Sequence, residues 1–113
     1  MKEVLRNAIT EAFHEAGLAM RAHDFQAAYS WIERAHILTQ RMPLAHGKSH
    51  WLMLNLGLLT KDWREVAGQL PRIIAALLFS RIWVPVGNRG RARVSAFSAM
   101  PLSADLEELL RED

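Results

Sequence analysis

No cysteine occurs in the 113 residues of this chain. Its absence excludes disulfides, thiolate zinc sites, iron–sulfur clusters and a cysteine nucleophile. Any bound metal ion would therefore need nitrogen or oxygen ligands. The length suits one hydrophobic core, so we expect a single helical domain over residues 1–113.

Long apolar runs and strong net charge are missing as well. The longest apolar run, residues 73–79, falls far short of the roughly 20 residues that span a bilayer. We therefore expect no membrane insertion and interpret the run as a buried helical segment. The first six residues are charged and amphipathic, unlike a secretory signal, which favours a cytoplasmic location. A formal charge of only +2 argues against a nucleic-acid partner.

Apolar residues recur at three- and four-residue spacing over most of residues 3–84, which predicts an all-α fold. Asp24 and Asp62 are each placed to cap the start of a helix. Pro43 marks the end of the second helix, and Pro71 is expected to kink or divide the fourth. The predicted helices cover residues 3–21, residues from 25 to Pro43, residues 44–59 and residues from 63 onward.

Two segments resemble each other, residues 23–28 and residues 61–66. Each reads as a tight turn, a capping aspartate and an aromatic residue that opens a helix, and Asp24 and Asp62 are 38 residues apart. This spacing is near the roughly 34-residue period of tetratricopeptide repeats. We therefore expect two consecutive antiparallel helical hairpins, tetratricopeptide-like, over residues 3–84.

The helical pattern fails after Pro85, which predicts an irregular tail over residues 85–113. Within this tail we expect a turn at residues 87–90, an extended stretch at residues 94–97 and a short terminal helix at residues 105–110.

Histidines and one glutamate suggest a metal site at the junction of the two hairpins. Glu33 and His36 are three residues apart, and His46 and His50 are four apart, so each pair shares a helical face. Because His36 and His50 both lie seven residues from Pro43, a reversal there would bring them level. The predicted ligands are Glu33, His36, His46 and His50, for one divalent zinc, nickel, cobalt, copper or iron ion.

The alternative is structural, with each buried histidine bonded to a carbonyl or carboxylate and Glu33 paired with Arg34 or Arg41. A second Glu-x-x-His, Glu11 and His14, could suggest a di-iron centre. His14, however, falls opposite the apolar stripe of its helix, and the third and fourth helices lack inward glutamates. We therefore do not expect two metal ions.

Two further groups of residues have competing interpretations. The arginines of the tail either form a solvated turn or grip a phosphate or acidic partner, and the solvated turn is favoured. These residues are Arg89, Arg91 and Arg93. The four tryptophans are expected in the core and between helices, at positions 31, 51, 63 and 83.

Several short motifs stand together in this chain: Glu-Arg-Ala-His at residues 33–36, His46, His50-Trp51, Asp-Trp-Arg-Glu at residues 62–65 and Gly87-Asn88. Their combination resembles a family of small bacterial proteins catalogued as a domain of unknown function, over about residues 24–110. The resemblance implies no established activity. It implies that such proteins are often encoded beside genes for heavy-metal efflux and metal-responsive regulation, which favours the metal interpretation. The three tail arginines depart from the family pattern.

The leading hypothesis is a cytoplasmic transition-metal-binding protein that acts as a buffer, carrier or sensor. The alternative is a helical-repeat adaptor that binds a protein or peptide in a groove containing Arg34, Asn55 or Gln69. A homodimer would cover exposed helix faces. A third class is an enzyme that uses a histidine as general base or a metal-bound water, for which the histidines are the only support. The sequence has no phosphate loop, nucleophile elbow or dinucleotide fingerprint, so an enzyme is the less favoured class.

Overall fold

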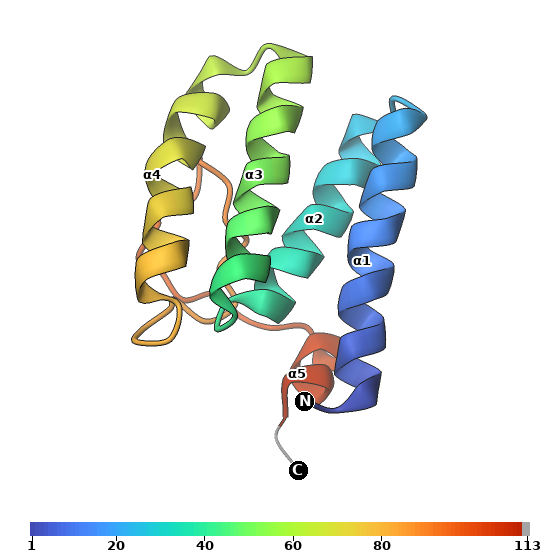
Figure 1. The fold of residues 1–113 in the computed structure, drawn as a ribbon, viewed down its shortest axis with the longest axis vertical. Coiled ribbons are helices and arrows are strands. Elements are labelled where there is room, and N and C mark those ends of the chain that lie inside the picture. Colours follow the sequence, from blue (N-terminus) through green and yellow to red (C-terminus); the bar gives the residue numbers. More distant parts are fainter. Residues whose placement is uncertain (112–113) are drawn as a thin grey trace.

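The computed structural model describes residues 1–111, and the secondary structure in this range is entirely helical. The predicted all-α fold is therefore confirmed (Figure 1). The helices are α1 (Glu3–Arg21), α2 (Phe25–Thr39), α3 (Pro43–Thr60), α4 (Trp63–Phe79) and α5 (Ala104–Leu110).

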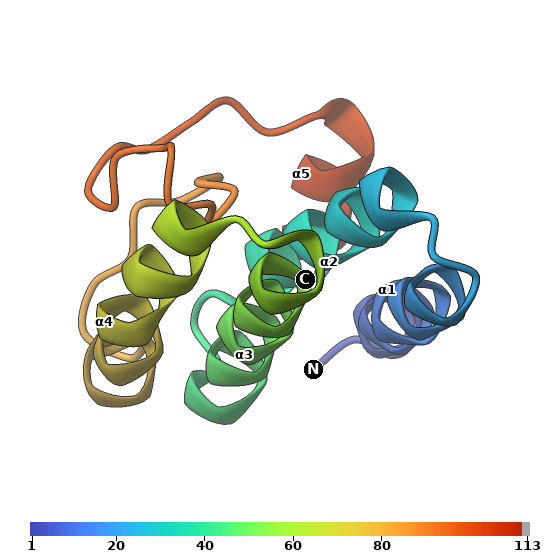
Figure 2. The same cartoon turned by 90° about the horizontal axis from the view of Figure 1, so that it is seen from above.

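Consecutive helices pack side by side as two antiparallel hairpins, α1 with α2 and α3 with α4, and α2 joins the hairpins by packing on α3 (Figures 1 and 2). The expected pair of hairpins is thus present. Its likeness to tetratricopeptide repeats stays a prediction.

The two hairpins turn in the same way. His23 and Lys61 each adopt a left-handed backbone, with φ of 58° and 57°. The following aspartate then caps the next helix, since Asp24 accepts from the Ala27 N–H and Asp62 from the Glu65 N–H, both at 3.2 Å. Both predicted caps are confirmed.

The two prolines act differently from one another. Pro43 is the first residue of α3, where its missing N–H costs no helical hydrogen bond, while α2 has already ended at Thr39. Pro71 lies inside α4, which continues through it as one helix instead of dividing.

The α4 helix buries a polar stripe and exposes an apolar one. Glu65, Gln69 and Ala76 face inward, followed by buried Ser80 at the C-cap. The apolar run 73–79, predicted to be buried, is instead largely exposed, with Ile74 at 60% and Leu78 at 64%. The reason is position: α4 lies at one end of the row of four long helices, with α1 at the other end (Figure 1), and it packs on α3 with one side. None of the helices in residues 1–111 combines the length and hydropathy needed to cross a membrane.

The tryptophan prediction also fails for three of the four residues. Trp51, Trp63 and Trp83 are each more than half exposed, at 56%, 62% and 56%. Only Trp31 packs, partly buried, against the core between the hairpins. Small residues fill the contacts between helices, as at Gly57, where an added Cβ would lie 2.9 Å from Val66 Cγ2.

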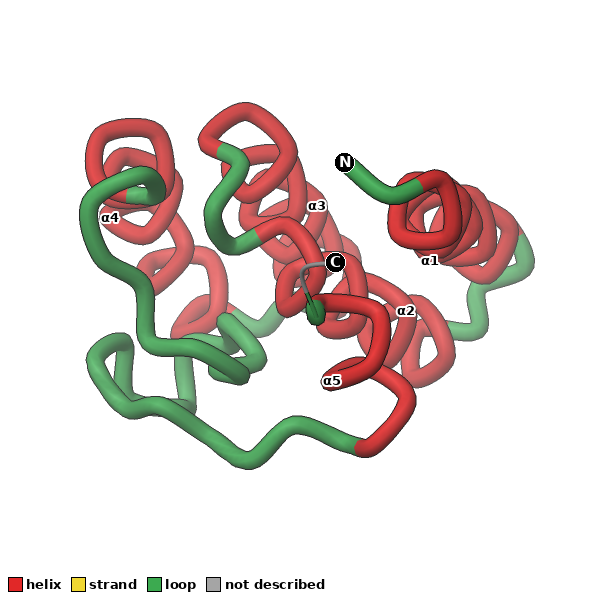
Figure 3. Tube along the Cα trace, turned by 90° about the horizontal axis from the view of Figure 1, so that it is seen from below, coloured by secondary structure: helices red, strands yellow, loops and turns green. Residues whose placement is uncertain are grey.

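The tail crosses back from the second hairpin to the first. The segment after α4 runs as loop and turn along one side of the helices (Figure 3), and α5 then packs on α1 and α2 through Leu106. The predicted terminal helix is confirmed. The extended stretch expected at residues 94–97 is wrong, since these residues form a bend and a turn.

Candidate metal centre

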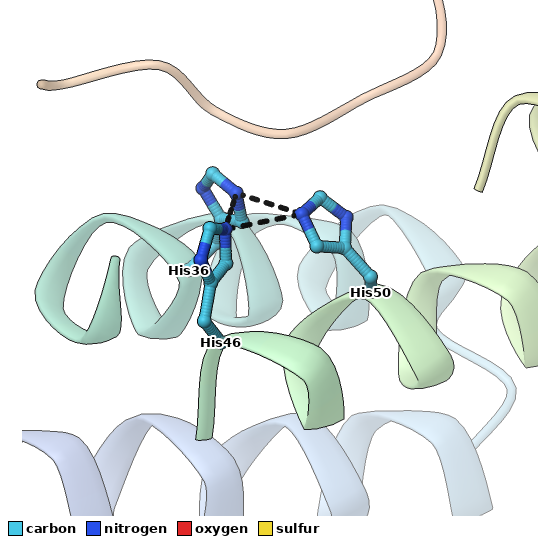
Figure 4. Close-up of side chains that lie close together, drawn as sticks. All are labelled: His36, His46 and His50. Atoms are coloured by element: carbon cyan, nitrogen blue, oxygen red, sulfur yellow. Dashed lines mark hydrogen bonds between the residues drawn. The ribbon is translucent and has the colours of Figure 1, made fainter. Parts of the chain in front are cut away.

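Three imidazoles from two helices converge at the junction of the hairpins. The Nε2 atom of His36 on α2 lies 3.0 Å from that of His46 and 3.1 Å from that of His50, both on α3. The Nε2 atoms of His46 and His50 are 3.2 Å apart (Figure 4). All three residues are buried, at 2%, 6% and 3% exposure.

Simple chain geometry produces this triangle. His36 and His50 are equally distant in sequence from Pro43, so they meet across the antiparallel pair α2 and α3, as expected. His46 lies one helical turn before His50 and joins it on the same face.

Glu33 does not join the triangle. Ligand atoms within 4.8 Å of one another come from the three histidines, and Glu33 is not among them. It lies half-buried one turn earlier on α2, where burial raises the pKa of its carboxyl while Arg91 and Arg89 act to lower it. The Glu33 carboxyl is thus under the electrostatic influence of the tail arginines. Of the four predicted ligands, the structure brings together the three histidines and not Glu33.

The tautomer of His46 follows from its neighbours on α4. His46 Nδ1 lies 2.8 Å from Ser80 Oγ, and the Ser80 hydroxyl already donates its proton to the Ala76 carbonyl. Ser80 must therefore accept from His46 Nδ1–H. In the neutral ring this leaves a lone pair on Nε2, directed into the triangle.

His50 is oriented in the same way by Gln69. The Gln69 amide nitrogen donates to the Glu65 carboxylate at 2.5 Å and to the Gly90 carbonyl at 2.9 Å, two groups that only accept. The amide oxygen therefore faces His50 Nδ1 at 2.6 Å and accepts its proton. His50, like His46, presents an Nε2 lone pair.

His36 is enclosed by the tail. A Cβ at Gly90 would lie 2.7 Å from both Cδ2 and Nε2 of His36, and Gly90 has a φ of +87°, so the bare backbone packs on the ring. His36 Nδ1 is buried and makes no hydrogen bond of normal geometry within the described residues.

Burial keeps all three imidazoles neutral. It lowers the pKa of His46 to about 4 and that of His50 to about 3, and neighbouring His46 lowers the latter further. Burial also lowers the pKa of His36 well below its ordinary value, with His50 and His46 acting in the same direction. Neutral imidazole is the form that binds metal ions.

The sequence model of the family described as "Protein of unknown function (DUF3703)" matches residues 3–110. The chain belongs to this family. No curated protein and no solved structure matches the chain. The expected membership of a family of unknown function is thus confirmed, and the family description assigns no activity to this DUF3703 chain.

Two side chains to which the sequence assigned no role, Asn88 and Gln40, hold the tail in place by hydrogen bonds. The Asn88 amide donates to the carbonyls of Ser95 and Ser98, and its oxygen accepts from the Gly90 N–H. Gln40 bonds the Pro85 carbonyl and the Gly87 N–H, both at 3.0 Å. The tail therefore has no regular secondary structure at this point, but side-chain hydrogen bonds hold it in a defined conformation.

The tail arginines bind the chain's own carboxylates. Arg91 Nε donates to buried Glu65 at 2.9 Å, and its guanidinium lies 3.5 Å from the Tyr29 ring centroid. Arg93 pairs with Asp62. The favoured solvated turn is therefore wrong for Arg91, which is partly buried in an ion pair. Of the three tail arginines, Arg89 alone is exposed and has no ion pair with a described residue.

Proposed function

We propose that this chain binds one divalent transition metal ion through the Nε2 atoms of His36, His46 and His50, as a cytoplasmic buffer, carrier or sensor in metal homeostasis. One observation carries the proposal: the Nε2 atoms of His46 and His50 lie 3.2 Å apart while both Nδ1 protons are donated elsewhere. The Nε2 lone pairs of His46 and His50 thus face each other inside the protein.

A purely structural role accounts poorly for this arrangement. His36 can contribute at most one Nε2–H to the triangle, so in the absence of a cation this single proton faces the Nε2 lone pairs of both His46 and His50, and at least one lone pair stays buried without a full hydrogen bond. Each unsatisfied buried polar group costs about 1–3 kcal/mol. A shared cation would satisfy all three nitrogens at once.

The dimensions of the triangle suit a metal ion. The three Nε2 atoms are 3.0–3.2 Å apart. If an ion lies about 2.0–2.1 Å from each of them, the N–metal–N angles are roughly 100°, between the octahedral and tetrahedral values. Three neutral imidazoles favour zinc, cobalt, nickel, copper or iron over magnesium and calcium, which prefer oxygen. Three protein ligands leave at least one position open, as ion exchange requires.

The surrounding hydrogen bonds support the same proposal. Metal-bound histidines ordinarily donate their second N–H to a fixed acceptor. Ser80 and Gln69 accept in this way from His46 and His50, and Gln69 is itself bonded to the buried carboxylate of Glu65. The rings are held in the metal-binding tautomer before any ion arrives.

Elemental analysis of purified, tag-free protein tests the proposal. Reconstituted protein should retain close to one ion of zinc, nickel, cobalt, copper or iron after gel filtration. The double variant His36→Ala, His50→Ala should lose it, whereas His14→Ala, which alters an exposed histidine of α1, should not. Wild-type protein free of metal after exposure to every ion would refute the proposal.

A second candidate, the helical adaptor, is favoured by the exposed apolar side chains of α4. Leu70, Ile74 and Leu77 are 54%, 60% and 47% exposed and follow helical spacing. Of the groove positions proposed from sequence, Gln69 is buried against His50 and is not available to a partner. If α4 binds a partner or a second copy, Ile74→Ser with Leu77→Ser should abolish that association, measured by light scattering, and leave metal content unchanged.

A further inference from the structure

The three histidines line a half-open cavity of about 490 Å³ between α4 and the tail. Much of its wall is apolar and includes Phe79, Trp83, Val84 and Phe97. Because all three imidazoles belong to this wall, the open coordination position of a bound ion would face the cavity. The volume lies within the range of roughly 300–1,000 Å³ typical of small-molecule sites.

A divalent ion in this place would leave positive charge uncompensated. The three imidazoles are neutral ligands and supply no negative charge to balance the ion. Arg72 also lines the cavity, and its charge acts to lower the pKa of both His36 and His50. The buried carboxylate of Glu65 is paired with Arg91. Excess positive charge in an apolar enclosure is costly unless an anion accompanies it.

Arg72 retains hydrogen-bonding capacity for such an anion. Its guanidinium donates to the Gly68 carbonyl at 2.9 Å and to the Val94 carbonyl at 3.0 Å, two of its five N–H groups. Within residues 1–111 no carboxylate lies in ion-pair distance of it. Arg72 is thus a fixed, half-buried cation at the cavity wall.

We infer that the cavity binds a small organic carboxylate with an apolar body, which places its carboxylate between the metal ion and Arg72 and its body against Phe79, Trp83 and Phe97. This inference rests on the proposed metal site. The ion and Arg72 would bind the carboxylate by charge and hydrogen bonds, and the apolar side chains of the wall would contact the body of the ligand.

Cobalt-loaded protein provides the test, because the visible absorption of cobalt(II) reports directly on its ligands. Octanoate, acetate and octanamide separate the two parts of the inference. Octanoate should change the spectrum saturably and bind on the order of tenfold or more tighter than acetate, since it buries additional methylene groups. Octanamide, which has the same body but no charge, should not change it.

Two variants locate the site, and a third serves as the control. Arg72→Gln should weaken octanoate binding on the order of tenfold while cobalt still binds. Ala75→Phe adds a ring to the cavity wall, so it should weaken octanoate but spare acetate. Arg64→Gln, which alters an exposed arginine of the same helix, should change neither. If Arg72→Gln does not fold, Ala75→Phe and the three probes still test whether the cavity binds the carboxylate.

The failures of the two proposals are distinguishable. Protein that binds cobalt in the histidine site but whose spectrum ignores octanoate would overturn the carboxylate inference alone. Equal responses to octanoate and octanamide would overturn its anionic part. Protein that binds no cobalt would overturn the proposed metal function and, with it, this inference.

Discussion

His46 and His50 face each other through Nε2 atoms that are 3.2 Å apart, and neither of these atoms carries a proton. Their Nδ1 protons are donated to Ser80 and Gln69, side chains that are themselves committed as donors to other groups. A hydrogen bond between the two rings is therefore excluded in the neutral state.

Removing the acceptor of a histidine N–H should weaken metal binding without removing a ligand. Gln69→Leu deprives His50 of its partner, and Ser80→Ala does the same to His46. Loss of such contacts typically costs about 10- to 100-fold in metal affinity. Competition with a chromophoric chelator measures this, with exposed Gln26→Leu on α2 as the matched control. Unchanged affinity in both variants would show that the orientation of the rings is unimportant.

A side chain at position 90 should disturb both the fold and the site. In Gly90→Ala the Cβ would lie 2.7 Å from His36 Nε2 and would require φ near +87°. We expect destabilisation of about 2–4 kcal/mol from strain and overpacking, measured by urea unfolding, together with weaker metal binding.

The matched control for this variant is Gly17→Ala. A Cβ at Gly17 would make only an ordinary contact, 3.7 Å from Arg21 Nη1. Since Gly17 lies within α1, alanine should stabilise the protein by roughly 0.5–1 kcal/mol. If Gly90→Ala behaved like Gly17→Ala, the close packing of the tail on His36 would be refuted.

The metal-free protein should lose stability in mild acid. Burial lowers the pKa of His46 from 6.5 to about 4, so below pH 6.5 the unfolded chain binds more protons than the folded one. The stabilisation is complete above this pH and declines as the pH falls toward 4. Each such histidine contributes a slope of up to about 1.4 kcal/mol per pH unit.

Urea unfolding at several pH values in the presence of a chelator measures this slope. His50→Leu removes one of the titrating groups, so its stability should fall less steeply with acid. A free energy of unfolding that stays constant from pH 7 to pH 5 would mean that the buried rings are not neutral in the way described.

Periodicity and spacing predicted much of the fold and the core of the site. The helices follow from apolar residues at helical spacing, and both hairpin turns follow from a capping aspartate. The meeting of His36 and His50 follows from their equal distance to Pro43. These features depend on one helix or one turn, so the local sequence determines them.

The burial of the polar stripe of α4, which the sequence did not predict, depends on which side of α4 meets α3. The apolar run 73–79 suggested burial, yet the buried stripe of α4 is the polar one that contains Glu65, Gln69 and Ser80. The signal was present, since these residues recur at helical spacing. Their partners, however, are the histidines of α3 and the backbone of the tail, which only the tertiary structure brings near.

Long-range ¹H–¹⁵N correlation spectra of the histidine side chains, recorded before and after one equivalent of zinc, test the central claim most directly. In metal-free protein His46 and His50 should be neutral with the proton on Nδ1. Zinc should then shift the Nε2 resonances of His36, His46 and His50 together, leave the Nδ1 protons of His46 and His50 in place and spare His14 and His23. Zinc that shifts no resonance of the triad, or that shifts His14 and His23 instead, would contradict the account.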